Sequence, residues 1–290
     1  MKNRFTKIIF MSFIIFTVQL FAFQKTGAVS GASGGGGVGA LEDVDGAYLN
    51  PAQIAVFSKK VFAVSASSSH LNIEMIDNGR DALFPAGVTY TKIDENHIRT
   101  EAYHLIIAYP LYTSSLPKLN STQNPSTSEL AFGVDVSLRE IKLEFLDEKY
   151  RQTVVSPGLF YQMTDSVFMG LVWKNKPLSD TDLTDSLDKN STVALGFSYV
   201  YDKFAKTRFD IETADNEKTD FLIYKFGLET FINDWIITRI GYQNDNAHSL
   251  NYFTAGLGFA GPQFGLHYAY QSEARKTTDP LHTIDLNISF

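Results

Sequence analysis

Three glycines near the start of the chain have the spacing of a nucleotide-binding loop. Gly34, Gly36 and Gly39 lie in "SGASGGGGVGALEDVDGAYLNPAQIAVF" (30–57) and match G-x-G-x-x-G. In a dinucleotide site such glycines let the backbone approach a pyrophosphate, but the pattern requires a buried strand directly before them. A different kind of segment stands there, and no Lys-Ser or Lys-Thr follows, which also excludes a P-loop. The glycines are therefore not predicted to bind a nucleotide.

The other side chains that could do chemistry are scattered along the chain. Its six histidines form no His-x-x-x-His pattern, and no G-x-S-x-G nucleophile elbow is present. His267 near Asp285 could form half of a Ser-His-Asp site, although an inward histidine on a polar wall is more often structural. Cysteine is absent, which excludes thiolate catalysis and cysteine zinc sites. The sequence predicts no enzyme, with no catalytic residue, cofactor or metal site.

The segment before the glycines is predicted to be a signal peptide, residues 1–22. Lys2, Arg4 and Lys7 precede an apolar stretch from Ile8 to Phe23 that contains the small residue Ala22. That stretch is short for a membrane span, so a single anchoring helix is the alternative. The formal net charge of -7 argues against a nucleic-acid partner.

The remaining chain alternates apolar and polar residues, as β-strands do. The last segment places four apolar side chains on one face, and we interpret these as the signal read by the barrel assembly machinery: Ile284, Leu286, Ile288 and Phe290. The same alternation recurs in earlier segments, with Tyr or Phe near the strand ends. A soluble sandwich rarely needs so many aromatics there, whereas an outer-membrane barrel turns such a face to lipid and has aromatic girdles. We predict an all-β, transmembrane, antiparallel up-and-down barrel over 58–290, in the outer membrane.

Connection lengths alternate between short and long, as between the periplasmic and external ends of such a barrel. Thirteen segments are clear, and bacterial barrels use an even number. Splitting Val61–Ile76 into two strands gives about fourteen, with twelve as the alternative. Two features are irregular: a Ser- and Pro-rich loop at Thr113–Glu129, and a slip of the alternation between Leu138 and Ile141. A bulge or a strand that leaves the membrane would each explain the slip.

The polar face of the strands predicts charged side chains inside the barrel. These are Asp135, Arg208, Asp210, Glu212, Lys225, Glu229, Arg239, His267 and Asp285. Charges of both signs on adjacent strands favour ion pairs that brace the wall and hold an interior segment. A ring that selects solutes by charge is the alternative. Arg239 and Glu229, on neighbouring strands, form the strongest predicted pair.

The segment at 23–57 is predicted to fold into the barrel as a plug. Asn50 can cap a helix that begins at Pro51, and the glycines upstream allow close passage along the wall. The alternative is a turn at Asn50-Pro51 preceded by a disordered tail.

The small-residue run, the acidic residues and "GAYLNPAQIA" resemble the hatch motif of the FadL superfamily of outer-membrane transporters. The matching residues are Gly36, Gly39, Asp43, Asp45, Asn50, Pro51 and Ala52. The stretch from "FGLETFINDW" to "YAYQ", and then "HTIDLNISF", resembles the PorV/PorQ-type branch. The resemblance implies a fourteen-stranded barrel with an inward N-terminus, whose partners are outer-membrane lipid and a small hydrophobic ligand. It implies transport of such molecules or, alternatively, a PorV-like scaffold in protein export; a general porin comes third.

Overall fold

The computed structural model describes residues 27–42, 44–56, 59–79, 82–95, 97–115, 127–144, 147–178, 191–202, 204–214, 222–246, 249–275 and 279–290. The predicted signal peptide at 1–22 lies outside these residues, and so does Asp43. The strands of the described residues are β1 (Lys60–Ser67), β2 (His70–Asp77), β3 (Ala86–Glu95), β4 (Ile98–Ser115), β5 (Thr127–Leu143), β6 (Glu148–Gln162), β7 (Val167–Lys174), β8 (Lys176–Pro177), β9 (Thr192–Tyr201), β10 (Ala205–Ala214), β11 (Leu222–Phe231), β12 (Ile236–Asp245), β13 (Leu250–Ala260), β14 (Phe264–Glu273) and β15 (Leu281–Ser289).

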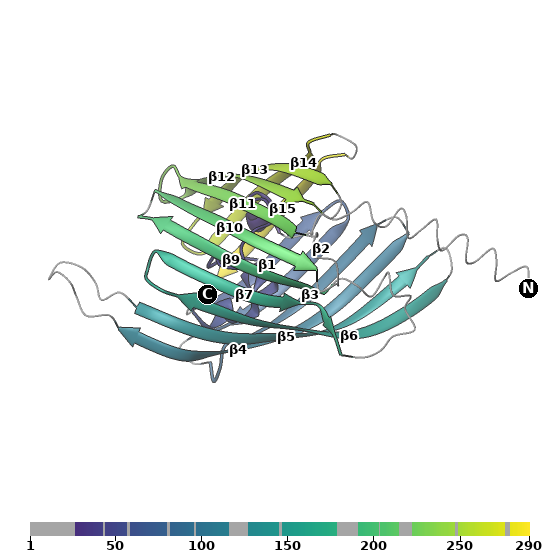
Figure 1. The fold of residues 1–290 in the computed structure, drawn as a ribbon, viewed down its shortest axis with the longest axis horizontal. Helices are drawn as coiled ribbons and strands as arrows, with labels where there is room; N and C mark the ends of the chain where they lie inside the picture. The colour runs from purple at the N-terminus through teal and green to yellow at the C-terminus, as the bar shows by residue number, and fades with distance from the viewer. Residues whose placement is uncertain are drawn as a thin grey trace, which may run out of the picture.

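The strands form one closed antiparallel barrel (Figure 1). Each pairs with its neighbours in the chain, and the first pairs with the last, with Val61 opposite Ser289. The two-residue β8 only continues the pairing along β6. Fourteen strands therefore make the wall, which confirms the prediction of fourteen and shows that the alternative of twelve is wrong. The stretch Val61–Ile76 divides into β1 and β2, as the even count requires.

The two faces of the wall differ as the alternation predicts. In β9, Leu195, Phe197 and Tyr199 are exposed on the outer face, whereas Ala194 and Ser198 are fully buried on the inner face. Aromatic side chains also meet on the outer face at the strand ends, where the Trp235 ring stacks on Phe259. An apolar outer face with aromatic ends and a polar interior is the pattern of a barrel in lipid.

β4, β5 and β6 are the longest strands and sweep along one side of the barrel (Figure 1). The pairing of β5 with β4 runs without a break through Leu138 and Ile141, so no bulge lies there. Past this point the outer face becomes charged: Glu140 pairs with Lys149 at 2.9 Å and with Arg151 at 3.2 Å. The alternation therefore slips because the strand extends beyond the apolar band.

Both ends of the predicted loop at Thr113–Glu129 belong to strands in the structure. β4 continues to Ser115 and β5 begins at Thr127, which leaves 116–126 outside the described residues. The irregularity of this hairpin lies in β4, where the register shifts between Pro110 and Tyr112.

Residues 27–56, apart from Asp43, lie inside the barrel and are called the inner segment below. They contain two short helices, α2 (Ala28–Gly31) and α3 (Gly46–Leu49), and the 3-10 helix η1 (Pro51–Ala55). Nearly all of their side chains are buried, and they contact strands on both sides of the lumen, β4 to β6 and β13 to β15. None of the helices in the described chain is long and apolar enough to cross a membrane.

Candidate functional site

The inner segment is fixed at its centre by Asn50. Its side-chain oxygen accepts a hydrogen bond of 3.2 Å from the backbone N–H of Ala52, which caps η1. The amide nitrogen donates to the backbone oxygen of Val38 at 3.1 Å and to that of Leu159 on β6 at 2.9 Å. One fully buried side-chain amide thus joins the start of η1, the glycine-rich stretch and the wall, and its polar atoms are paired.

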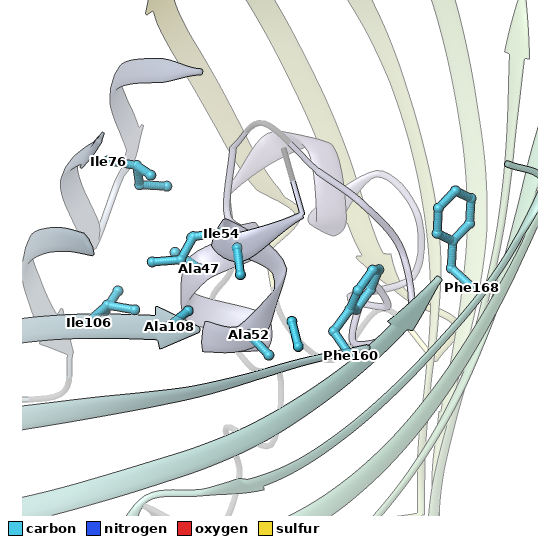
Figure 2. Packing of buried hydrophobic residues seen from close by; sticks show 10 residues of the cluster. Ala47, Ala52, Ile54, Ile76, Ile106, Ala108, Phe160 and Phe168 are labelled. Carbon is cyan, nitrogen blue, oxygen red and sulfur yellow. The ribbon is translucent and has the colours of Figure 1, made fainter. Parts of the chain in front are cut away.

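η1 packs on the wall through an apolar cluster, shown in Figure 2. Ile54 and Ala52 of η1 face Ile106 on β4, Ala131 on β5 and Phe160 on β6, and all five are almost fully buried. Burying aliphatic side chains contributes roughly 1.5–3 kcal/mol for each large one. This side of the inner segment is therefore held by apolar packing.

On the opposite side, wall side chains bind the backbone of the inner segment. Asp210 of β10 accepts from the N–H groups of Gly37 at 2.7 Å and Val38 at 3.0 Å. Asp285 of β15 accepts from Ala28 at 2.6 Å, and Thr254 of β13 accepts from Gly34 at 3.0 Å. The interaction recognises the main chain, which explains why small residues without long side chains stand here.

Seven wall strands each place an inward glycine against the inner segment. A Cβ added at any of them would lie within 2.0 to 2.7 Å of an atom of the segment, closer than real Cβ contacts allow. These glycines, called the glycine belt, are Gly133, Gly158, Gly170, Gly196, Gly227, Gly241 and Gly256. The belt lets backbone meet backbone around much of the lumen.

A chain of buried ion pairs connects the inner segment with four strands. Glu42 of the segment receives Lys206 at 2.6 Å and Arg208 at 2.7 Å. Arg208 lies 3.5 Å from Glu229, which pairs with Arg239 on the adjacent strand. Arg239 in turn donates to Nδ1 of His267 at 3.2 Å. Opposite charges alternate along this chain from Lys206 to Arg239, as buried charges require.

Two further sets of paired polar side chains lie elsewhere on the wall. Glu212 is held by Lys174 at 3.2 Å and by Lys225 at 2.7 Å. Nδ1 of His104 lies 2.9 Å from a carboxylate oxygen of Asp135. Each set joins neighbouring or nearby strands and leaves its charges paired inside the barrel.

Asp45, just before α3, is the acidic group of the inner segment whose ionisation is most altered. Burial raises the pKa of its carboxyl to about 6, and the nearby Glu42 adds to the rise. Hydrogen bonds from the backbone N–H and the hydroxyl of Ser30, at 3.4 and 2.8 Å, act in the opposite direction. The residue also has a left-handed backbone, with φ of 66°.

The nine interior charges named from the sequence are all buried on the inner face of the wall.

Within the motif, Gly36, Gly39, Asp45, Asn50, Pro51 and Ala52 lie in the inner segment, and Asp43 falls outside the described residues. Of the four residues predicted as the assembly signal, Ile284, Leu286 and Ile288 lie exposed on the outer face of β15, and Phe290, just after the strand, is also exposed. His267 and Asp285 are opposite each other on β14 and β15. Across the described residues, no group of three or more His, Cys, Asp or Glu could hold a metal.

Sequence reasoning missed Glu42 and the glycine belt. Glu42 stands beside Asp43 and Asp45 in the same acidic stretch, and nothing in its spacing singles it out. The belt had a usable signal: one glycine recurs near the middle of successive strands, between apolar residues, as in "FGV", "MGL", "LGF", "FGL" and "IGY".

A cavity of about 270 Å³ lies between the inner segment and the wall. Its lining includes residues at the same end of the barrel as the last residue, such as Ser289 and Gly261. Val29, Leu41 and Val44 of the inner segment supply an apolar part. Glu42 and several wall side chains supply a polar part.

The closed, fourteen-stranded antiparallel barrel with an apolar outer face is the fold of outer-membrane proteins. Among solved structures, the chain is similar to the CymD monoaromatic hydrocarbon channel, with 12% identity, a TM-score of 0.61 and coverage of 93% of this chain and 97% of that one. It is also similar to the Pseudomonas putida toluene transporter TodX, with 11% identity, a TM-score of 0.55 and coverage of 93% and 98%. No family model and no curated protein sequence matches the chain. At such low identity, the likeness to these structures shows the fold.

Proposed function

We propose that this chain is a FadL-like outer-membrane transporter through which small hydrophobic molecules pass, and that the inner segment is the plug that closes its lumen. The observation that carries the proposal is the seating of the segment: polar wall groups bind its backbone on one side, and an apolar cluster holds it on the other. A chain placed across a lumen in this way blocks a water-filled path.

Two further observations support transport of hydrophobic molecules. The fold is shared over nearly the whole chain with two proteins described as a monoaromatic hydrocarbon channel and a toluene transporter. The packing of η1 on the wall is apolar, so a displaced plug would leave an apolar surface along β4 to β6. The interior charges then serve mainly as braces, since each of the pairs described above joins opposite signs.

The proposal is tested by uptake of a labelled monoaromatic hydrocarbon across asymmetric bilayers with a lipopolysaccharide outer leaflet. We expect the intact chain to raise uptake above that of a protein-free bilayer. A chain with Gly39→Ala, whose added Cβ would lie 2.4 Å from the Gly196 backbone, should alter the rate because its plug is unseated. Equal uptake with and without the protein would contradict transport.

The second candidate, a PorV-like scaffold, predicts a different result in the same experiment. A scaffold would leave hydrocarbon uptake at the protein-free rate while the barrel stays folded. Heat-modifiable migration on a gel reports folding, so this outcome is distinguishable from a misfolded sample.

A further inference from the structure

The cavity between the inner segment and the wall has a size and a lining that indicate which class of ligand fits it. Its volume is about 270 Å³, and an apolar cavity of about 150 Å³ accommodates benzene. The space therefore suits one ring, or a short chain of similar size, with a small substituent. It is below the usual range for drug-sized ligands, roughly 300–1,000 Å³.

The charges of the lining favour an uncharged ligand. Four charged residues line the cavity, Lys59, Arg239, Glu42 and Glu229, and His267 lies beside Arg239. Arg239 and Glu229 pair with each other, and Glu42 is held by two cations of β10. A charged ligand loses its hydration when it enters the cavity. None of these four groups is an unpaired charge that could compensate for that loss, so binding of a charged ligand is unfavourable.

One polar group of the lining lacks a partner. The side-chain oxygen of Asn287 has no hydrogen-bond donor among the described residues, and the residue is only 7% exposed. Leaving a buried acceptor unpaired costs about 1–3 kcal/mol. Gly265 borders this oxygen, since a Cβ added there would lie 2.1 Å from it. In the structure this oxygen is covered, and a rotation of the amide about its last torsion, which is soft, would bring it to the cavity.

We propose that this cavity is a binding site for a small uncharged hydroxyl compound, a phenol or a short alcohol, held by donation of its O–H to Asn287. The apolar part of the ligand contacts Val29, Leu41 and Val44 of the inner segment and Phe264 of the wall. An amine would supply a donor too, but it is charged at neutral pH, and the lining has no net charge to receive it. The biological role of this site rests on the proposed transport: a transported molecule binds here at the end of the lumen from which it leaves.

The test is fluorine NMR of the purified full chain in detergent with two probes, 4-fluorophenol and 4-fluoroanisole. The second probe has nearly the same shape but no O–H donor. We expect 4-fluorophenol to bind about five- to tenfold more tightly, the range of one net hydrogen bond of about 1 kcal/mol or slightly more. In Asn287→Leu the difference between the probes should vanish. In Ala260→Phe, which fills the cavity from the end of β13, both probes should lose affinity.

The matched control is Leu266→Ala, which lies on the outer face of β14 next to Gly265 and should leave both affinities unchanged. Gel migration shows whether each variant is folded. Equal affinity for the two probes, or binding that survives both cavity variants, would overturn the proposal. Binding without hydrocarbon uptake would leave this site standing and contradict transport, whereas uptake without binding would do the reverse.

Discussion

The carboxylate of Asp210 on β10 accepts a hydrogen bond of 2.7 Å from the backbone N–H of Gly37. A second bond of 3.0 Å comes from Val38, so one wall residue holds two consecutive amides of the inner segment. We expect Asp210→Ala to leave both amides unpaired at a cost of about 1–3 kcal/mol each. Hydrogen exchange at these amides should rise, and Asp210→Asn, which keeps an acceptor, should show a smaller effect. Unchanged exchange in the alanine variant would contradict this role.

The glycines of the inner segment make an internally controlled pair. At Gly39 an added Cβ would lie 2.4 Å from the backbone of Gly196, whereas at Gly36 the nearest atoms are 3.5 Å away, an ordinary contact. We expect Gly39→Ala to unseat the segment and Gly36→Ala to leave it in place. Limited proteolysis of the folded barrel reports the difference as faster cleavage in the Gly39 variant. Equal cleavage of the two variants would show that close approach to β9 does not hold the segment.

Charge reversal at Arg239 tests the bracing by ion pairs. Arg239→Glu places a carboxylate opposite Glu229, its cross-strand neighbour, in the buried chain that includes Glu42. Breaking a buried pair destabilises by about 3–5 kcal/mol, so the temperature of the gel-migration shift should fall. The control is Glu140→Gln, because its two ion pairs are on the outer surface, where exposed pairs contribute little to stability. A barrel as stable as the parent after the reversal would refute the brace.

The raised pKa of Asp45 predicts a pH dependence of the inner segment. Its carboxyl has a pKa of about 6 in the fold against its ordinary value of 3.8. The folded segment therefore holds a proton that the released segment does not. The free energy that holds the inner segment in place is therefore most favourable below pH 4. It weakens as the pH rises through 6, by up to about 3 kcal/mol. Glu42 adds to the rise, and Glu74 of β2 and Asp285 of β15 are the other acids that interact with Asp45.

Protection factors from hydrogen exchange at pH 5 and pH 7.5 measure this effect. We expect amides of α2 to be better protected at pH 5, after correction for intrinsic exchange rates. Asp45→Asn keeps the acceptor for Ser30 and removes the titration, so much of the pH slope should disappear. A slope that is identical in the variant would contradict the assignment of the pH dependence to Asp45.

The barrel could be predicted from the sequence for two reasons. The period-two alternation can be read within each segment alone, and the even number of strands in bacterial barrels fixes the count. Residues such as Ile284 and Leu286 show the lipid face directly, and the pairing of β1 with β15 follows from closure. The slip at Leu138–Ile141 could not be resolved, since a bulge and an extension past the membrane produce the same break in pattern. The structure decides it through the unbroken register and the outer-face pairs of Glu140.

The seating of the inner segment was less accessible to sequence reasoning. Asn50 and Pro51 indicate a helix start, but the hydrogen bonds of Asn50 to Val38 and Leu159 depend on how the inner segment lies against the wall. Glu42 meets Lys206 and Arg208 across more than 160 residues, and no local rule selects it over Asp43. Long-range contacts of this kind become visible only when the barrel is closed.

Single-channel conductance in planar bilayers tests most directly whether the inner segment closes the lumen. The intact chain is compared with a chain lacking Gly31–Phe57 and with Gly39→Ala, which covers the case in which the deletion does not fold. We expect the intact chain to show little or no steady conductance and at least one of the two variants to show discrete open steps. Large steady conductance of the intact chain, or folded variants as silent as the parent, would contradict a plug held in the barrel.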